Sequence, residues 1–290
     1  FMKNPLFNLF ITLGIVVLFA CTKKQITNKY TVSTNQKTQI ITGADQISEY
    51  LPLLKGKRVA MLVNQTSIIG KKASVDSLLS LGVNIVKVFG PEHGFRGDHD
   101  AGAQVSNGVD SKTGLPLWSL YGASKQPSAA QMQQLDIVIF DIQDVGVRYY
   151  TYISSMHYMM QAAAQYGVQM LVLDRPNPNG AYVDGPVLDL AFQSFVGMHP
   201  IPLLHGMTVA ELAQMIKGEG WITDADKLHL QLVPVKHYRR DMAYSLPVKP
   251  SPNLPNAQAI ALYPSLGFFE ATPLSVGRGT AFAFQVIGYD

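Results

Sequence analysis

Short apolar runs of strand length alternate with segments of helical pattern through much of this 290-residue chain. Polar loops separate the runs, and the segments between them carry apolar side chains at helical spacing. Strands that alternate with helices favour a mostly parallel sheet with helices on both faces, which is a Rossmann-like α/β fold. The expected strands are residues 58–63, 83–89, 117–121, 137–141 and 168–173, and the expected helices are residues 74–81, 128–135 and 153–165.

The composition of the sequence changes after residue 180, where prolines are frequent. Thr208 and Glu211 have the spacing of a capping box, so a helix is expected over residues 208–217. An apolar run at residues 282–287 predicts a strand, and the chain stops directly after it. We therefore expect a Rossmann-like domain over residues 41–185 and a smaller α+β domain over residues 186–290, incomplete at its C-terminal end.

Composition excludes several classes of function. The net charge is only +3 and the lysines form no basic stripe, so nucleic acid is not an expected partner. A single cysteine excludes a disulfide framework and a cysteine-based zinc cluster. The first expected strand does not end in Gly-x-Gly-x-x-Gly, the fingerprint of a dinucleotide site. We expect no cofactor and no metal.

The N-terminal segment has the pattern of a secretory signal. Lys3 precedes a short apolar stretch at residues 6–20, which ends in Leu-Phe-Ala-Cys at Cys21. This ending resembles a bacterial lipobox, in which the cysteine becomes the lipidated N-terminus; the alternative is an ordinary buried thiol. The sequence thus predicts a signal peptide over residues 1–21, a flexible tether over residues 22–40, and an exported lipoprotein that faces the periplasm, with no other contact to a membrane.

Glu92 lies in the loop that follows the expected strand at residues 83–89, within Pro-Glu-His-Gly-Phe-Arg-Gly (residues 91–97). Ligands of open α/β sheets bind where the strands end, and a carboxyl group held there could act as a general acid. Alternatively, Glu92 pairs with Arg96 or accepts hydrogen bonds from loop amides. His93 next to it, together with Asp98, His99 and Asp100, permits a metal site. The spacing contains no helical pair of histidines, so a loop histidine bonded to the backbone is favoured.

The end of the expected strand at residues 137–141 is also rich in acidic, basic and aromatic residues. They lie in the segment Asp-Ile-Gln-Asp-Val-Gly-Val-Arg-Tyr-Tyr-Thr-Tyr (residues 141–152). Asp141 and Asp144 are candidate carboxyl groups, followed by the cation Arg148 and by aromatic rings that suit a sugar, which has both apolar patches and hydroxyls. Tyr149 and Tyr152 would share one helix face if the helix begins here. The alternative is a helix start at which Asp144 complements the dipole and the tyrosines are half-buried.

Three further strand ends or loops carry candidate binding groups. Asn64 follows the first expected strand, and Asp174 with Arg175 follows the strand at residues 168–173. Glu270 and Arg278 lie between glycines further on. Asp174 with Arg175, and Glu270 with Arg278, could each bind a ligand or form a salt bridge within the protein.

Taken together, these segments resemble one family, the bacterial exo-β-N-acetylmuramidases, long known only as a domain of unknown function. The resemblance runs through residues 54–66, 90–97, 140–152, 174–180, 250–255 and 269–280. It implies release of terminal N-acetylmuramic acid from the non-reducing end of peptidoglycan fragments, by a Rossmann-like domain and a smaller domain that together form the cleft. The family's catalytic glutamate falls on Glu92, while Ala271 stands where glycine is common.

Glycosidases generally use two carboxyl groups, about 5–5.5 Å apart for retention and roughly 6.5–9.5 Å for inversion. The expected partner of Glu92 is Asp141 or Asp144, with Glu270 next, although an acetamido sugar also permits substrate assistance. The lactyl carboxylate of the substrate suits an arginine. His93, Tyr149, Tyr152, Asn64, Asp174 and Glu270 are the other expected substrate-binding residues, and the candidate arginines are Arg148, the first choice, Arg175 and Arg278.

Two other functions remain open at this point. One is a peptidoglycan-binding lipoprotein without catalysis, which would bind the saccharide and release no product. The other is a metal-dependent hydrolase that uses His93, His99 and the nearby aspartates on an ester or amide.

Overall fold

The computed structural model describes residues 39–96, 107–122 and 124–289. Its centre is a seven-stranded sheet, in which neighbouring strands are parallel except for β5 against β6. This is the mostly parallel α/β sheet that the sequence predicts. In spatial order the strands are β11 (Leu230–Val233), β8 (Gln169–Leu173), β7 (Ile137–Asp141), β1 (Val59–Val63), β4 (Ile85–Gly90), β6 (Pro116–Ser119) and β5 (Gly108–Val109).

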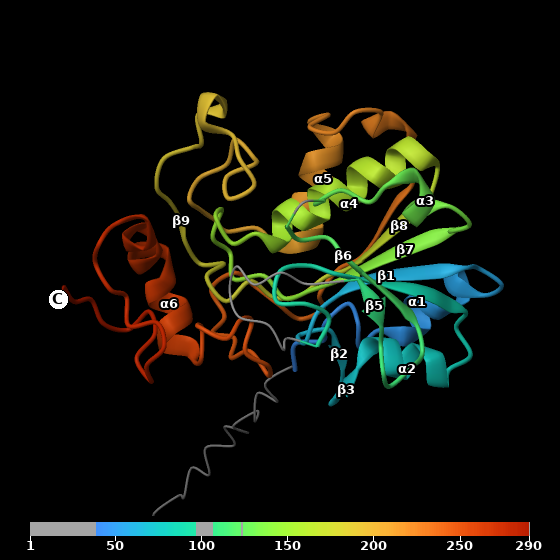
Figure 1. The fold of residues 1–290 in the computed structure, drawn as a ribbon, viewed down its shortest axis with the longest axis horizontal. Coiled ribbons are helices and arrows are strands. Elements are labelled where there is room, and N and C mark those ends of the chain that lie inside the picture. The colour runs from blue at the N-terminus through green and yellow to red at the C-terminus, as the bar shows by residue number, and fades with distance from the viewer. Residues whose placement is uncertain (1–38, 97–106, 123, 290) are drawn as a thin grey trace, which may run out of the picture. The chain divides into compact units, whose positions relative to one another are not determined.

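Helices cover both faces of the sheet because successive strand residues point to opposite sides. In β1, Val59, Met61 and Val63 join one apolar cluster, whereas Ala60 and Leu62 join the other. The cluster of Ala60 includes residues of α3 (Ala129–Met132), α4 (Tyr152–Tyr166) and α5 (Val209–Gly218), and that of Val59 includes residues of α1 (Ile47–Leu54) and α2 (Ser74–Ser80), as Figure 1 shows.

Strand order reverses at the centre of the sheet. The chain passes from β1 to β4 and β6 on one side, then returns to β7 on the other side of β1 and continues to β8 and β11. The loops at the carboxyl ends of β1, β4 and β7 therefore leave the sheet as neighbours. Such a reversal is where open α/β sheets bind their ligands.

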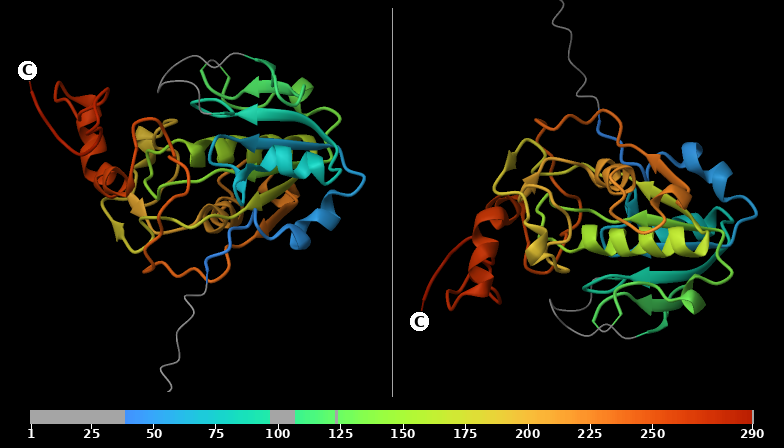
Figure 2. Two further views of the ribbon diagram at one scale, coloured as in Figure 1. Left: turned by 90° about the horizontal axis from the view of Figure 1, so that it is seen from below. Right: turned by 90° about the horizontal axis from the view of Figure 1, so that it is seen from above.

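The remaining elements are short. Two hairpins pair β2 (Ile68–Ile69) with β3 (Lys72–Ala73) and β9 (Val183–Asp184) with β10 (Leu204–His205). Helix α6 (Ala257–Leu266) lies at the end of the fold away from α1, as both views of Figure 2 show. The single-turn helices are η1 (Leu190–Phe192), η2 (Ala225–Lys227) and η3 (Gly267–Ala271).

Local signals explain where several helices end. The predicted capping box of α5 is confirmed, with Thr208 accepting from the backbone of Glu211 and Glu211 accepting in return. Helix α4 ends at Gly167, which adopts the left-handed conformation that glycine favours. Helix α3 is shorter than expected because the backbone leaves the helical path at Gln133, which has a ψ of 142°, and Gln134 then has a φ of 61°.

Two expectations need correction. Residues 282–287 form no strand, and residues 282–285 form turns, because Phe284 has a φ of 51° and its amide donates to the carbonyl of Val276. Tyr149 precedes α4, which begins at Tyr152, so these two tyrosines do not share a helix face.

The division into domains at residues 185 and 186 stays a prediction. Strand β11 lies beyond that boundary and pairs with β8 in the central sheet, with Leu230 opposite Met170 and Val233 opposite Leu173. Near the start of the described part, Ile41 forms a bridge with Lys236. Among the described residues, none of the helices is long and apolar enough to cross a membrane.

Candidate active site

A pocket of about 200 Å³ opens beside the loops that follow β4 and β7. Its other wall comes from residues 251–284, which include α6 and η3. The pocket brings together half of the residues that the sequence singles out as catalytic or substrate-binding, from segments that are far apart in the chain. These are Glu92, His93, Tyr149, Tyr152, Glu270 and Arg278.

A tight turn places Glu92 directly after the carboxyl end of β4. The amide of Gly94 donates to the carbonyl of Pro91 at 3.0 Å, and His93 and Gly94 have φ angles of 68° and 76°. A left-handed conformation is uncommon for a residue other than glycine, such as His93. Backbone strain of this kind is found most often at functional sites. The chain folds back so closely that a Cβ atom on Gly90 would lie 3.1 Å from the amide nitrogen of Phe95.

Two hydroxyl groups lie near the Glu92 carboxylate. Oγ1 of Thr151 donates to Oε2 of Glu92 at 3.0 Å. The phenol of Tyr121, which follows β6, lines the same pocket. Burial, and then the negative charge of Glu92, raise the pKa of Tyr121, so its phenol keeps its proton and can donate to that carboxylate.

The second carboxyl group in the pocket is Glu270. Its Oε1 lies 3.0 Å from a guanidinium nitrogen of Arg278. Burial raises the pKa of Glu270, Arg278 lowers it, and the charge of Glu92 raises it further, with a net upward shift. The negative charge of Glu92 therefore acts on the Glu270 carboxyl group across the pocket.

The predicted tyrosines lie at the pocket, but their hydroxyls are bonded to the protein backbone. Tyr149 donates to the carbonyls of Tyr263 and Pro264 at 2.7 and 3.0 Å, and Tyr152 donates to Pro250 at 3.1 Å. The ring of Tyr149 packs edge-on against that of Tyr263, with centroids 5.2 Å apart. Tyr152 is buried, so the ring of the half-buried Tyr149 is what this pair offers to a ligand.

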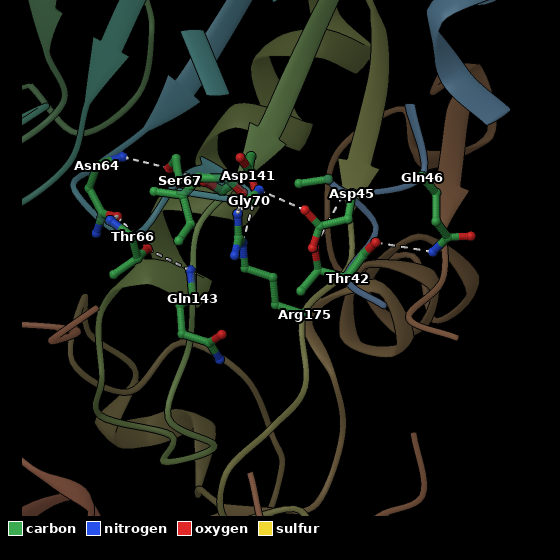
Figure 3. A network of polar contacts seen from close by, with 12 residues as sticks. Thr42, Asp45, Gln46, Asn64, Thr66, Ser67, Gly70, Asp141, Gln143 and Arg175 are labelled. Atoms are coloured by element: carbon green, nitrogen blue, oxygen red, sulfur yellow. Dashed lines mark hydrogen bonds and ion pairs between the residues drawn. The ribbon is translucent and has the colours of Figure 1, made fainter. Parts of the chain in front are cut away.

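Asp141 and Arg175 do not line the pocket. Both are buried, and the Arg175 guanidinium donates to Oδ1 of Asp141 at 2.7 Å and to the carbonyl of Ile68 at 3.0 Å. Figure 3 shows this pair within a polar network, in which Ser67 donates to the carbonyl of Asp141 and Asn64 accepts from Thr66. The pair ties the end of β7 to the loop after β8.

The other predicted binding residues also contact protein groups outside the pocket. Burial raises the pKa of Asp144 to about 7, and its Oδ2 accepts from the amide of Gly146. Asp174 accepts from the amides of Ala210 and Val235, which joins β8 to the start of α5 and the end of β11. The Arg148 guanidinium donates to the carbonyls of Pro186 and Ile201, and the buried Asn64 organises the turn after β1.

Sequence reasoning missed several residues that line the pocket. Thr151 lies inside the segment 141–152, and Ser251, Asn253 and Leu254 lie inside the proline-rich segment 250–255, so a signal for these four was present. Phe195, on the turn between Ser194 and Gly197, carried no signal, because only folding brings it to the pocket. The other missed residues are Tyr121, Val196, Tyr263 and Phe284, whereas Tyr150 belongs to the aromatic rings that the second motif predicted.

The residues proposed for a metal site lie mostly outside the described part of the chain, which ends at Arg96 and resumes at Asn107. Asp98, His99 and Asp100 fall in this gap. In the described segments, no group of three His, Cys, Asp or Glu side chains is placed to hold a metal ion.

Comparison with known proteins decides the family. The model of the family described as "Exo-beta-N-acetylmuramidase NamZ, N-terminal" matches residues 59–258, and its C-terminal counterpart matches residues 261–290. This chain belongs to the NamZ family. It is 45% identical over 263 residues to the peptidoglycan β-N-acetylmuramidase NamZ of Bacillus subtilis (strain 168). That match covers 88% of this chain and 63% of the relative, so the chain spans less than two thirds of the relative's length.

Two solved structures share the fold, and both are proteins of family DUF1343 from Bacteroides fragilis NCTC 9343. The first has a TM-score of 0.79 and 49% sequence identity, and the match covers 87% of this chain and 67% of the other. The second has a TM-score of 0.78 and 36% identity, over 86% and 65% of the two chains. The predicted membership of the family and the predicted fold class are confirmed.

The buried pair of Asp141 and Arg175 leads to a test of stability. Arg175→Met leaves the Asp141 carboxylate buried without its cation, and we expect the free energy of unfolding to fall by about 3–5 kcal/mol. Urea denaturation of the purified protein measures this. Arg58→Met is the matched control, because it breaks the exposed pair of Arg58 and Asp136 and should cost far less. Equal losses in the two variants would contradict a structural role for the buried pair.

Proposed function

We propose that the protein is an exo-acting glycoside hydrolase that releases terminal N-acetylmuramic acid from the non-reducing end of peptidoglycan fragments. The observation that carries the proposal is the presence of two carboxyl groups, Glu92 and Glu270, in one pocket with an arginine and aromatic rings. Glycosidases use paired carboxyl groups, and aromatic rings suit the apolar patches of a sugar. The relative from Bacillus subtilis bears the name of this activity.

Within this function, Glu92 is the principal carboxyl group and Glu270 replaces Asp141 and Asp144 as its partner. The positions of the side chains support this choice, because the two aspartates are buried outside the pocket and bonded to protein groups. The raised pKa of Glu270 suits a carboxyl group that carries a proton nearer to neutral pH.

Arg278 is the proposed partner of the substrate's lactyl carboxylate. Of the three candidate arginines, Arg148 donates to backbone carbonyls and Arg175 pairs with Asp141. Only Arg278 lines the pocket, where the side chain is 46% exposed and a bound anion can reach it. Its guanidinium has several donors, so it can bind a second carboxylate while it remains paired with Glu270.

We also propose that the protein is exported and is anchored by a lipid on Cys21, facing the periplasm. Support comes from the sequence alone, since Cys21 lies outside the described residues. In a bacterium that expresses the chain, labelled fatty acid should enter the wild type and should not enter Cys21→Ala, which should leave the membrane fraction. A label in both proteins or in neither would refute the anchor.

Removal of either carboxylate tests the activity. Glu92→Gln keeps the size of the side chain and its capacity to accept from Thr151, and we expect kcat to fall about 10²- to 10⁴-fold. Glu270→Gln should also lower kcat. A chromogenic N-acetyl-β-muramide is the substrate, and an unchanged melting temperature confirms folding.

Glu219→Gln is the control for these variants, because Glu219 is exposed at the C-cap position after α5 and does not line the pocket. Near-normal turnover by a folded Glu92→Gln protein would refute the assignment. Binding of the sugar without any release by the wild type would favour the rival function, a binding protein that lacks catalysis.

Arginine substitution tests the recognition of the lactyl group. Arg278→Ala should weaken binding of N-acetylmuramic acid about 10- to 100-fold relative to N-acetylglucosamine, since a hydrogen bond to a charged group contributes about 1.5–3 kcal/mol. Calorimetric titration of both sugars gives the ratio of dissociation constants. Arg148→Ala is the matched control and should leave that ratio unchanged. A ratio that shifts in Arg148→Ala and not in Arg278→Ala would reverse the assignment.

A further inference from the structure

Thr151 stands at the N-cap position of α4 but does not cap the helix. Threonine is favoured there because its hydroxyl can accept a hydrogen bond from a backbone amide in the first turn. Ser128 of α3 and Thr208 of α5 cap their helices in this way, whereas α4 has no side-chain cap bond from Thr151. The backbone of Thr151 has helical angles, with φ −76° and ψ −4°, rather than the extended angles of a capping residue.

The hydroxyl of Thr151 reaches across the site instead. It donates to Oε2 of Glu92 at 3.0 Å, although the two residues are 59 positions apart in the chain. The bond joins the loop after β4 to the segment after β7, which lie on opposite sides of β1. Tyr121, after β6, lines the same pocket from the other side of β4, near enough that the charge of Glu92 raises its pKa.

The bond from Thr151 restricts the rotation of the Glu92 carboxylate before a substrate arrives, and the nearby phenol of Tyr121 offers a second donor. Reactive groups that are held in place in advance avoid the entropy cost of orientation in the transition state. We propose that Thr151 and Tyr121 are positioning residues, whose hydroxyls hold the Glu92 carboxylate in its reactive orientation. This inference rests on the function proposed above, and it adds two residues that act through Glu92.

The structure offers a substitution that removes this bond and little else. The carbonyl of Thr151 accepts from the amides of Ser154 and Ser155, both at 3.0 Å, and these bonds do not involve the side chain. Valine has nearly the shape of threonine and lacks its hydroxyl. Thr151→Val should therefore keep the first turn of α4 and lose only the donor to Glu92, and Thr151→Ser should keep the donor.

The kinetic experiment compares Thr151→Val, Thr151→Ser and Tyr121→Phe on a chromogenic N-acetyl-β-muramide. We expect kcat to fall about 10- to 100-fold in Thr151→Val and in Tyr121→Phe, with KM changed less than about twofold, because orientation affects the reaction more than binding. Thr151→Ser should restore most of the turnover. Thr223→Val is the control, since Thr223 is exposed and does not line the pocket.

Crystal structures of the same variants separate this inference from the proposed function. The torsion angles of the Glu92 side chain should change in Thr151→Val and stay as they are in Thr151→Ser, whether or not the protein cleaves a muramide. A wild type that releases no sugar would refute the proposed function and leave the structural comparison to decide the inference. An unmoved Glu92 in Thr151→Val, or equal losses of kcat in Thr151→Val and Thr151→Ser, would overturn it.

Discussion

Parallel pairing of β1 with β4 on one side and β7 on the other is the constraint on which the rest of the structure depends. All five residues of β1 are buried, so the register of this strand fixes both apolar layers at once. Since parallel strands end at the same edge, the loops after β4 and β7 emerge side by side. Glu92 and Thr151 meet for this reason, and the pocket forms against them.

Burial on both faces also explains why several polar residues at strand ends have structural roles. Asp141 and Asp174 end strands that helices cover, and a carboxylate in such a place needs donors. Asp141 obtains them from Arg175, and Asp174 from backbone amides near α5 and β11. Their positions at the carboxyl ends of strands gave the same sequence signal as Glu92. Asp141 and Asp174 differ from Glu92 in that they are buried and do not line the pocket.

Local sequence predicted most of the sheet and the best-marked helices, and it failed where the signals were mixed. The buried strands read as apolar runs, and α5 has its capping box. The sequence pattern did not predict α1 and α6, which contain Pro52 and Pro264, because proline is disfavoured in a helix interior. It also missed β11, whose Leu-Gln-Leu-Val pattern is only half-buried. The run at residues 282–287 is apolar enough for a strand, but the left-handed backbone of Phe284 prevents one.

By itself, the sequence determined the α/β class and the family, and it singled out the glutamate of the Pro-Glu-His-Gly motif as a candidate, because these depend on periodicity and on short motifs that are contiguous in the chain. Tertiary structure alone decided which residues share the pocket with that glutamate. Glu270 and Arg278 lie far along the chain from it, and Asp141, Asp144, Arg148 and Arg175 are nearer in sequence but bonded elsewhere. The physical reason is that charge and position in a motif do not reveal whether a side chain will find its partner inside the protein or in the pocket.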